Sequence, residues 1–161
     1  MGGQLAITLD SIDRRIIALL IRNGRFSSAE IRRRIGDGVS ERSIRYRIDR
    51  LQRTGVIRVS AILDPHALGY EVVGDVIIDV APGKLRVVAE ELATFDNVSY
   101  VAAAAGQGDL SIQVYARDNH ELLRFVDEVV GRLEGVTRTR VILVPWKLKD
   151  VYEWQVPETS D

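Results

Sequence analysis

The chain has 161 residues, of which 46% are apolar and 28% charged, and this balance predicts one ordinary globular domain or two small ones. Its formal net charge of -1 argues against a uniformly basic nucleic-acid binder, and the absence of cysteine excludes disulfide scaffolds, thiol catalysis and thiolate metal sites. Because the two histidines, His66 and His120, lie far apart in the sequence, we predict no enzyme activity, no metal and no cofactor. No apolar run approaches the roughly 20 residues of a membrane span, and the N-terminus lacks a signal-peptide core, so we expect a cytoplasmic protein with no membrane partner.

The net charge divides unevenly about a boundary at Asp64-Pro65. Residues 1–64 contain 13 arginines, no lysine and 7 acidic residues, a net charge of +6, whereas the other 97 residues contain 9 basic and 16 acidic residues, a net charge of -7. This asymmetry is typical of a nucleic-acid-binding part joined to a part with another role. A solvated helical face with a chance excess of arginine is the alternative.

The basic segment predicts three helices followed by a strand. Asp10 can cap the first helix, and the spacing of Ser27 and Glu30 is that of a capping box at the start of the second. Ser40 can cap a third helix that runs to Gly55. Two short helices followed by a third across a glycine-containing turn are the signature of a helix-turn-helix, with a plain three-helix bundle as the alternative.

The charge of the third predicted helix distinguishes these alternatives. At roughly 100° per residue, Ile44, Ile48 and Leu51 cluster on one side, and the opposite side is rich in arginine with one tyrosine. Arginine can bridge guanine O6 and N7 and can neutralise phosphates, so we predict that this helix binds the major groove of double-stranded DNA.

The candidate DNA-binding residues are Ser40, Arg42, Ser43, Arg45, Tyr46, Arg50 and Arg53. Within this set we predict that Arg50 and Arg53 contact phosphates on any sequence, whereas Arg42 and Tyr46 determine the sequence preference.

The acidic segment predicts the element order βαββαβ, which is the ferredoxin-like arrangement. The expected elements are a strand over 72–80, a helix over 85–95, strands over 98–105 and 110–114, a helix with Leu122, Val126, Val129 and Leu133 inward, and a strand over 137–144. The predicted fold class is therefore α+β, with a winged-type helix-turn-helix head before the ferredoxin-like domain.

Two helices can cover only one face of the predicted sheet. Val73 and Ile77 on the first strand, with Val101 and Ala103 on the second, indicate that the uncovered face is not very polar. An exposed apolar sheet face is typical of an interface, so we predict a homodimer through it.

Several short motifs, in this order and spacing, resemble the Lrp/AsnC family of feast/famine transcriptional regulators. The N-terminal part of the family is similar to Leu9–Ile16, Asn23–Arg25, Arg50–Ile57 and Leu63–Pro65. The family's C-terminal amino-acid-responsive domain is similar to Gly106-x-x-Asp109 and Gly135-Val136, and the resemblance covers about residues 9–149. The turn before the third helix departs from the usual Gly-Leu-Ser, because Gly36–Ser40 is two residues longer.

The resemblance implies a helix-turn-helix domain over 1–58, a hinge strand and linker over 59–70, a RAM-type ferredoxin-like domain for effector binding and oligomerisation over 71–149, and a tail over 150–161. It also implies dimers that can stack into octamers, with a small amino-acid-like effector held between neighbouring sensor domains.

Carried over from the family, the effector-binding residues are Tyr100, Ala104, Gly106, Gln107, Gly108 and Asp109. Backbone N–H groups of a glycine turn suit a carboxylate and an aspartate accepts from an ammonium group, so an amino acid fits this chemistry. The alternative is that the glycines only allow a tight strand connection, which Asp109 stabilises with its side chain.

The sequence thus predicts a sequence-specific DNA-binding transcriptional regulator that responds to an amino acid or a related metabolite at a subunit interface. One alternative is an architectural DNA-binding oligomer without an effector. The other is an enzyme, because haem-pathway decarboxylases are similar in architecture.

Overall fold

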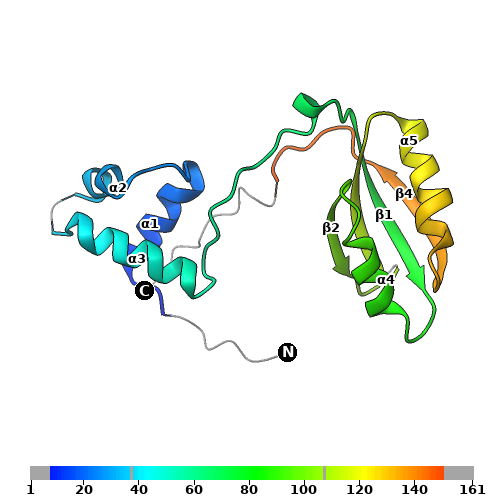
Figure 1. Cartoon of the computed structure of the whole chain (residues 1–161), viewed down its shortest axis with the longest axis horizontal. Helices are drawn as coiled ribbons and strands as arrows, with labels where there is room; N and C mark the ends of the chain where they lie inside the picture. Colours follow the sequence, from blue (N-terminus) through cyan, green and yellow to red (C-terminus); the bar gives the residue numbers. More distant parts are fainter. Residues whose placement is uncertain (1–7, 37, 107, 151–161) are drawn as a thin grey trace. The chain divides into compact units, whose positions relative to one another are not determined.

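The computed structural model describes residues 8–36, 38–106 and 108–150. These residues form two compact units: one holds the three N-terminal helices and extends to Ile62, and the other comprises Leu63–Leu148 and holds the sheet (Figure 1). Each unit has a separate hydrophobic core, so the protein has the mixed α and β composition that the sequence predicts.

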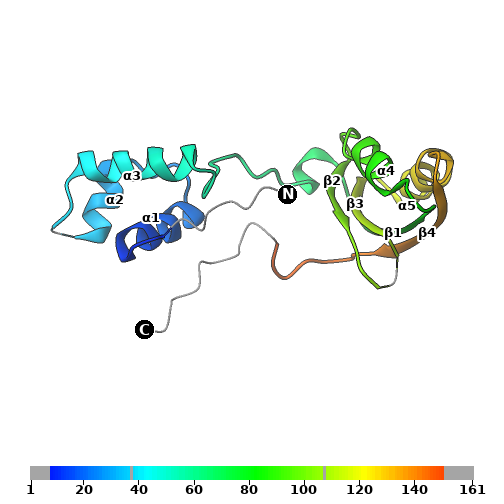
Figure 2. The same cartoon turned by 90° about the horizontal axis from the view of Figure 1, so that it is seen from below.

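The N-terminal unit, called the head below, consists of α1 (Ser11–Arg22), α2 (Ser28–Ile35) and α3 (Glu41–Arg53), and α3 packs across the other two helices (Figure 2). Its core is formed by one apolar face from each helix, and Ile16 of α1 and Ile44 of α3 are fully buried in it. Because each helix buries one stripe and exposes the other, the outer side of α3 is left for polar side chains.

Each helix of the head begins at the predicted cap. The Asp10 carboxylate accepts from the Asp13 N–H, and Ser27 and Glu30 form a reciprocal capping box. The Ser40 hydroxyl accepts from the Ser43 N–H at 3.1 Å and so starts α3. These local hydrogen bonds satisfy backbone donors that a helix leaves unpaired at its first turn.

The strand predicted after the third helix is not formed in the part of the chain that the structure describes. Between α3 and the sheet, the only regular element of the described residues is a 3₁₀ turn over His66–Leu68. A strand needs the backbone groups of a second strand beside it, and no other strand lies in the described part of the head. The described single chain therefore has no strand between α3 and the sheet, and the hinge over 59–70 stays a prediction.

The C-terminal unit has the predicted order βαββαβ and the predicted ferredoxin-like topology. All neighbouring strands are antiparallel in the order β2-β3-β1-β4, and α4 and α5 lie on the same face of the sheet (Figures 1 and 2). The elements are β1 (Val72–Val80), α4 (Leu85–Leu92), β2 (Val98–Ala103), β3 (Leu110–Ala116), α5 (Asn119–Arg124) and β4 (Val136–Leu143).

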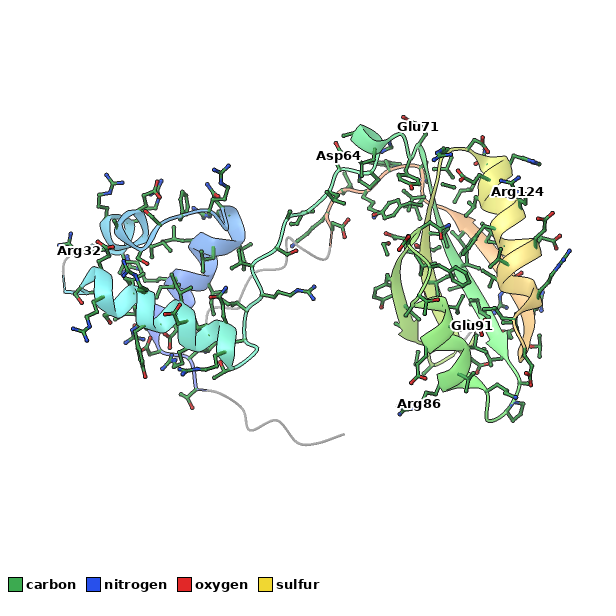
Figure 3. All side chains as sticks on the ribbon, in the orientation of Figure 1. Arg32, Asp64, Glu71, Arg86, Glu91 and Arg124 are labelled. Carbon is green, nitrogen blue, oxygen red and sulfur yellow. The ribbon has the colours of Figure 1, made fainter. Side chains whose placement is uncertain are left out.

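The second helix of this unit is less regular than its sequence pattern predicts. After α5 the chain continues through a π-helical turn over Phe125–Val129 and a 3₁₀ turn over Val130–Arg132. A π turn adds a residue, so Val130 and not the predicted Val129 is fully buried. Arg86 on α4 and Arg124 on α5 lie on the outer sides of the two helices (Figure 3).

The register determines which residues face away from the helices. On β1, Val76 and Ile78 belong to the buried core, so Val73 and Ile77 lie on the open face, as predicted. The prediction that Val101 and Ala103 share that face is wrong: they pair with the buried Ile112 and Leu110 of β3, and cross-strand partners point to the same side. Among the described residues, no helix is long and apolar enough to cross a bilayer.

Candidate nucleic-acid interface and candidate ligand site

The outer side of α3 presents a stripe of exposed arginine and tyrosine. Arg42, Tyr46 and Arg53 recur at four- and seven-residue spacing and are all exposed, and Tyr46 has 62% of its surface accessible. Within the described part of the chain, neither the Arg42 side chain nor the Arg53 side chain forms an ion pair or a hydrogen bond. Arg45 beside them is exposed and pairs with Glu41 at 3.1 Å, a contact of little energetic worth at the surface.

The N-terminal end of α3 is held by its cap and by the turn that precedes it. Ser40 is exposed and its hydroxyl caps the helix, whereas Ser43 is half-buried. Gly36 and Gly38 have φ values of 94° and 108°, which side chains rarely adopt, so both glycines are required by the conformation of this turn.

The guanidinium of Arg50 is not part of the exposed stripe on α3, because it binds α1. Its Nη2 donates to the carboxylate of Asp13, which is only 1% exposed, at 2.5 Å, and Arg47 donates to the other oxygen of the same carboxylate at 2.8 Å. Arg47 also binds Asp10 at 2.7 Å. The proposed contact of Arg50 with phosphate remains a prediction, but in this structure its guanidinium is bound to α1.

The charges in this cluster perturb one another. The backbone N–H of Asp13 and the guanidinium of Arg47 hold the pKa of Asp10 below its usual value. The hydrogen bonds that the Arg47 guanidinium donates to the carboxylates of Asp10 and Asp13 raise the pKa of Arg47. Asp13 and Arg47 were missed as candidate residues, although pairs at i, i+3 spacing on two helices are a visible signal for such a cluster.

Other arginines of the head also have contacts within it. Arg15 donates to the carbonyl oxygen of Ile35 at 2.9 Å and so satisfies the end of α2. Arg34 stacks on the ring of Phe26 with 4.0 Å to the centroid. Arg32 lies on the outer surface of the head (Figure 3). The positive charge of this segment is therefore divided between packing and an exposed surface.

In the C-terminal unit, the predicted effector turn connects β2 to β3. The Ala104 N–H donates to the Asp109 carbonyl at 2.8 Å, and Gly106 and Gly108 have φ values of 123° and 103°. This turn brings together Ala104, Gly106, Gly108 and Asp109. Tyr100 lies on β2 and is exposed, and Gln107 lies outside the described residues.

Asp109 has a structural contact. Its carboxylate accepts from the Val80 N–H at 2.7 Å, and its own N–H donates to the Ile78 carbonyl at 2.9 Å, which ties the turn to the end of β1. A Cβ atom on Gly108 would overlap the side chain of Ile77 on the open face. The alternative role that the sequence left open, a tight connection stabilised by Asp109, is thus present in the geometry.

An ion pair beside this turn adds both signs of charge. Arg140 of β4 and Asp79 of β1 pair at 3.0 Å, and both lie within 3.4 Å of the position that a Cβ on Gly108 would take. This pair was not predicted from the sequence because the contact depends on the β1–β4 register, although arginine at alternate positions of the last strand was a signal.

The open face carries a second polar group that is internally satisfied. Gln113 donates to Asp75 at 2.9 Å, and Lys147 donates to Gln113 at 2.6 Å and to the Tyr115 hydroxyl at 3.0 Å. Apolar side chains, among them Val73 and Ile77, lie on the same face. No group of three or more metal-ligating side chains is found in the part of the chain that the structure describes.

The fold and these surfaces define a class of protein: a helix-turn-helix domain whose third helix has an exposed, arginine-rich side, joined to a ferredoxin-like domain. Comparison with known families makes the assignment specific. The AsnC-type helix-turn-helix domain matches residues 9–52, and the Lrp/AsnC ligand binding domain matches residues 76–153. The chain belongs to the Lrp/AsnC family, and it is a transcriptional regulator of that type with a DNA-binding domain and a ligand-binding domain.

Relatives and solved structures agree with this assignment. An uncharacterized HTH-type transcriptional regulator of Pyrococcus abyssi is 40% identical over 149 residues, which cover 92% of this chain and 90% of the relative. The regulator FL11 of the same organism is 35% identical over 141 residues, covering 87% and 91%.

Two solved structures show the same fold. Escherichia coli AsnC superposes with a TM-score of 0.81 at 22% identity and covers 91% of this chain and 99% of its own. A Neisseria meningitidis transcriptional regulator in complex with L-Met has a TM-score of 0.82 at 22% identity, covering 89% and 94%.

Proposed function

We propose that the protein recognises specific DNA sequences through α3, assembles through its C-terminal domain, and binds an amino acid or a related small metabolite at a subunit interface. The observation that carries the proposal is the exposed stripe of Arg42, Tyr46 and Arg53 on the helix that follows the helix-turn-helix turn. The major groove of B-DNA admits an α-helix, and the arginines of such a helix can hydrogen-bond to base edges and phosphates.

The candidate DNA contacts differ in what they read. Arg42 and Tyr46, near the start of α3, are placed to reach base edges, because a recognition helix reads bases with its N-terminal residues. Arg45 and Arg53 supply charge to the phosphates. Ser40 and Ser43 lie at the N-terminal end of α3, where backbone N–H groups and the helix dipole favour a phosphate.

The proposed effector site is the β2–β3 turn with its neighbours. Gly106, Gln107 and Gly108 would offer backbone N–H groups to a carboxylate, and Asp109 would accept from an ammonium group. Tyr100 and Ala104 would line the approach from β2. Support comes from the positive φ of both described glycines and from the Neisseria regulator of the same fold, which was solved as a complex with L-Met.

A homodimer through the open sheet face is the proposed unit, with further stacking into octamers. Two of the four residues predicted on the open face, Val73 and Ile77, lie there and are only half-buried in the single chain, and Ile142 near the end of β4 is exposed. Covering this apolar surface with a second copy would stabilise the pair. Effector binding between subunits would then shift the spacing of two paired heads on DNA, which is the coupling that regulation needs.

An architectural DNA-binding role without an effector is the second candidate, and two observations at the β2–β3 turn favour it. Asp109 already accepts from the Val80 N–H, and the space beside Gly108 is already filled by Ile77, which a Cβ at that position would overlap, so the turn has a structural role without a ligand.

Light scattering coupled to size-exclusion chromatography, with and without an amino-acid mixture, tests assembly and effector response together. We expect a dimer or a larger assembly whose mass or elution changes with the mixture. A monomer in both conditions would contradict the proposed assembly, and an unchanged oligomer would favour the architectural role.

A further inference from the structure

The head buries a carboxylate that the proposed DNA contacts do not use. Asp13, on the first turn of α1, is 1% exposed, and among the described residues it is the one buried polar or charged side chain. A buried charge is costly unless it is paired, and Asp13 is paired with two arginines, both from α3. The contact therefore joins the first helix directly to the helix proposed to enter the groove.

The geometry of this pairing is two-sided. Asp10 and Asp13 are three residues apart at the start of α1, and Arg47 and Arg50 are three residues apart on α3. Each pair therefore lies on one face of its helix, and the two faces meet. Two guanidinium groups share one carboxylate, with Asp10 as the outer acceptor for Arg47. Such a clamp resists rotation of α3 about its own axis, because either rotation lengthens one of the two ion pairs.

Burial separates these arginines from the exposed stripe. The side chain of Arg50 is 31% exposed and that of Arg47 is 20% exposed, and the Nε of Arg50 is buried without a hydrogen-bond partner among the described residues. Arg53, one turn further along α3, is exposed. Two arginines of the same helix thus have opposite environments, although a sequence pattern treats them alike.

We propose that Asp13 is a positioning residue for DNA recognition. It withholds Arg47 and Arg50 from the DNA backbone and fixes the rotation of α3, so that Arg42 and Tyr46 face the bases. The proposal rests on the proposed DNA binding by α3, and it replaces the phosphate contact expected of Arg50 with an internal one.

The proposal predicts that Asp13→Asn strengthens nonspecific DNA binding and weakens sequence discrimination. The asparagine keeps the shape but loses the charge that holds the two guanidinium groups, which can then reach phosphates. Each phosphate contact changes the slope of log K against log salt by about 0.9. The variant should bind a pool of random-sequence duplexes more tightly at low salt, with a slope steeper by up to about 1.8 for each bound head, and should discriminate less between a selected duplex and the pool.

A matched pair of variants provides the sharper test in the full-length protein. Arg50→Met and Arg53→Met remove the same charge and keep an apolar stem, one from the internal cluster and one from the exposed stripe. Fluorescence anisotropy on the random duplex pool should show an unchanged salt slope for Arg50→Met, and a slope reduced by about 0.9 per head for Arg53→Met. Circular dichroism checks that each variant retains its helices.

The outcomes separate the inference from the proposed function. Equal reductions for both variants, or an unchanged slope in folded Asp13→Asn, would overturn the positioning role while leaving DNA binding by α3 intact. If wild-type protein binds DNA and neither arginine variant alters the slope, the assignment of α3 as the DNA-binding helix fails, and the inference fails with it. Should Asp13→Asn not fold, the comparison of Arg50→Met with Arg53→Met decides between these outcomes.

Discussion

Replacing Asp109 by asparagine separates a ligand-binding role from a structural one. The carboxylate accepts a hydrogen bond of 2.7 Å from the Val80 N–H. Asparagine keeps an oxygen that can accept this bond but loses the negative charge that an ammonium group needs. Asp109→Ala removes both, so the two variants together distinguish the two roles.

The magnitudes follow from the exposure of the group. Asp109 is exposed, so its single hydrogen bond is worth about 1 kcal/mol. In a domain of this size, 1 kcal/mol corresponds to roughly 4–8 °C in Tm. Asp109→Ala should therefore lower the Tm of the C-terminal domain by that amount, whereas Asp109→Asn should remain within about 2 °C of wild type. A ligand at 100 times its Kd should raise the stability of wild type by about 2.7 kcal/mol.

The assay is a thermal-shift panel of the twenty amino acids against wild type, followed by titration of any stabilising compound into both variants. We expect Asp109→Asn to keep the wild-type Tm and to lose the ligand-dependent shift. Asp127→Asn, which removes an exposed carboxylate from the helix-bearing side, is the control and should keep both. A full ligand shift in Asp109→Asn would refute the proposed role of the charge and leave Asp109 as a structural residue.

Three further predictions concern the stability of the two units. Gly108→Ala should destabilise the C-terminal domain by more than Gly83→Ala. Both glycines have positive φ, where a side chain costs about 1–2 kcal/mol, but only the Cβ at Gly108 would overlap Ile77. Equal losses of unfolding free energy in urea denaturation would contradict the packing argument. Ile44→Ala should cost the head about 2–5 kcal/mol, because this side chain is fully buried between three helices, and a loss below about 1 kcal/mol in the same assay would show that the site tolerates the cavity. Because the pKa of Asp10 is lower in the folded head, its carboxylate contributes stability above the unfolded pKa of about 4, and this stability is lost as pH falls through the folded value. The free energy of unfolding of the wild-type head should therefore fall on acidification below about pH 4. Asp10→Asn should show a smaller change over the same pH range.

Local signals predicted the elements well. The caps at Asp10, Ser27 and Ser40 depend on hydrogen bonds within four residues, so they are readable from short motifs and are confirmed. The period-2 and period-3.6 patterns of the C-terminal half gave the correct βαββαβ order, because a sheet covered on one face alternates apolar and polar residues.

Features that depend on how elements meet could not be predicted in the same way. A helical wheel placed Arg50 beside the exposed stripe, but its partner, Asp13, comes from another helix. The face of Val101 was misassigned because a shift in register between Val98 and Tyr100 changes which residues of β2 face the helices. The inward position Val130 depends on a π turn that leaves no clear mark in the sequence.

In the candidate sites too, contacts between residues close in sequence were predictable and contacts between distant strands were not. Four of the proposed effector-site residues, Ala104, Gly106, Gly108 and Asp109, lie in one turn because the Ala104–Asp109 hydrogen bond closes a short connection, and their role in ligand binding stays a prediction. The contact of Asp109 with Val80, and the Arg140–Asp79 pair beside Gly108, join strands that are distant in sequence, so only the sheet register reveals them.

Selection of duplexes from a random pool by the full-length protein, followed by footprinting, tests the central claim most directly. We predict an enriched, two-fold symmetric site whose half-sites are separated by whole helical turns of roughly 10–10.5 base pairs, since paired heads must reach the same side of the duplex. Arg42→Ala and Tyr46→Ala should each select a different motif, whereas Arg53→Ala should select the same motif with lower affinity. No enriched sequence, or a motif that Arg42→Ala and Tyr46→Ala both leave unchanged, would contradict recognition of DNA by this helix.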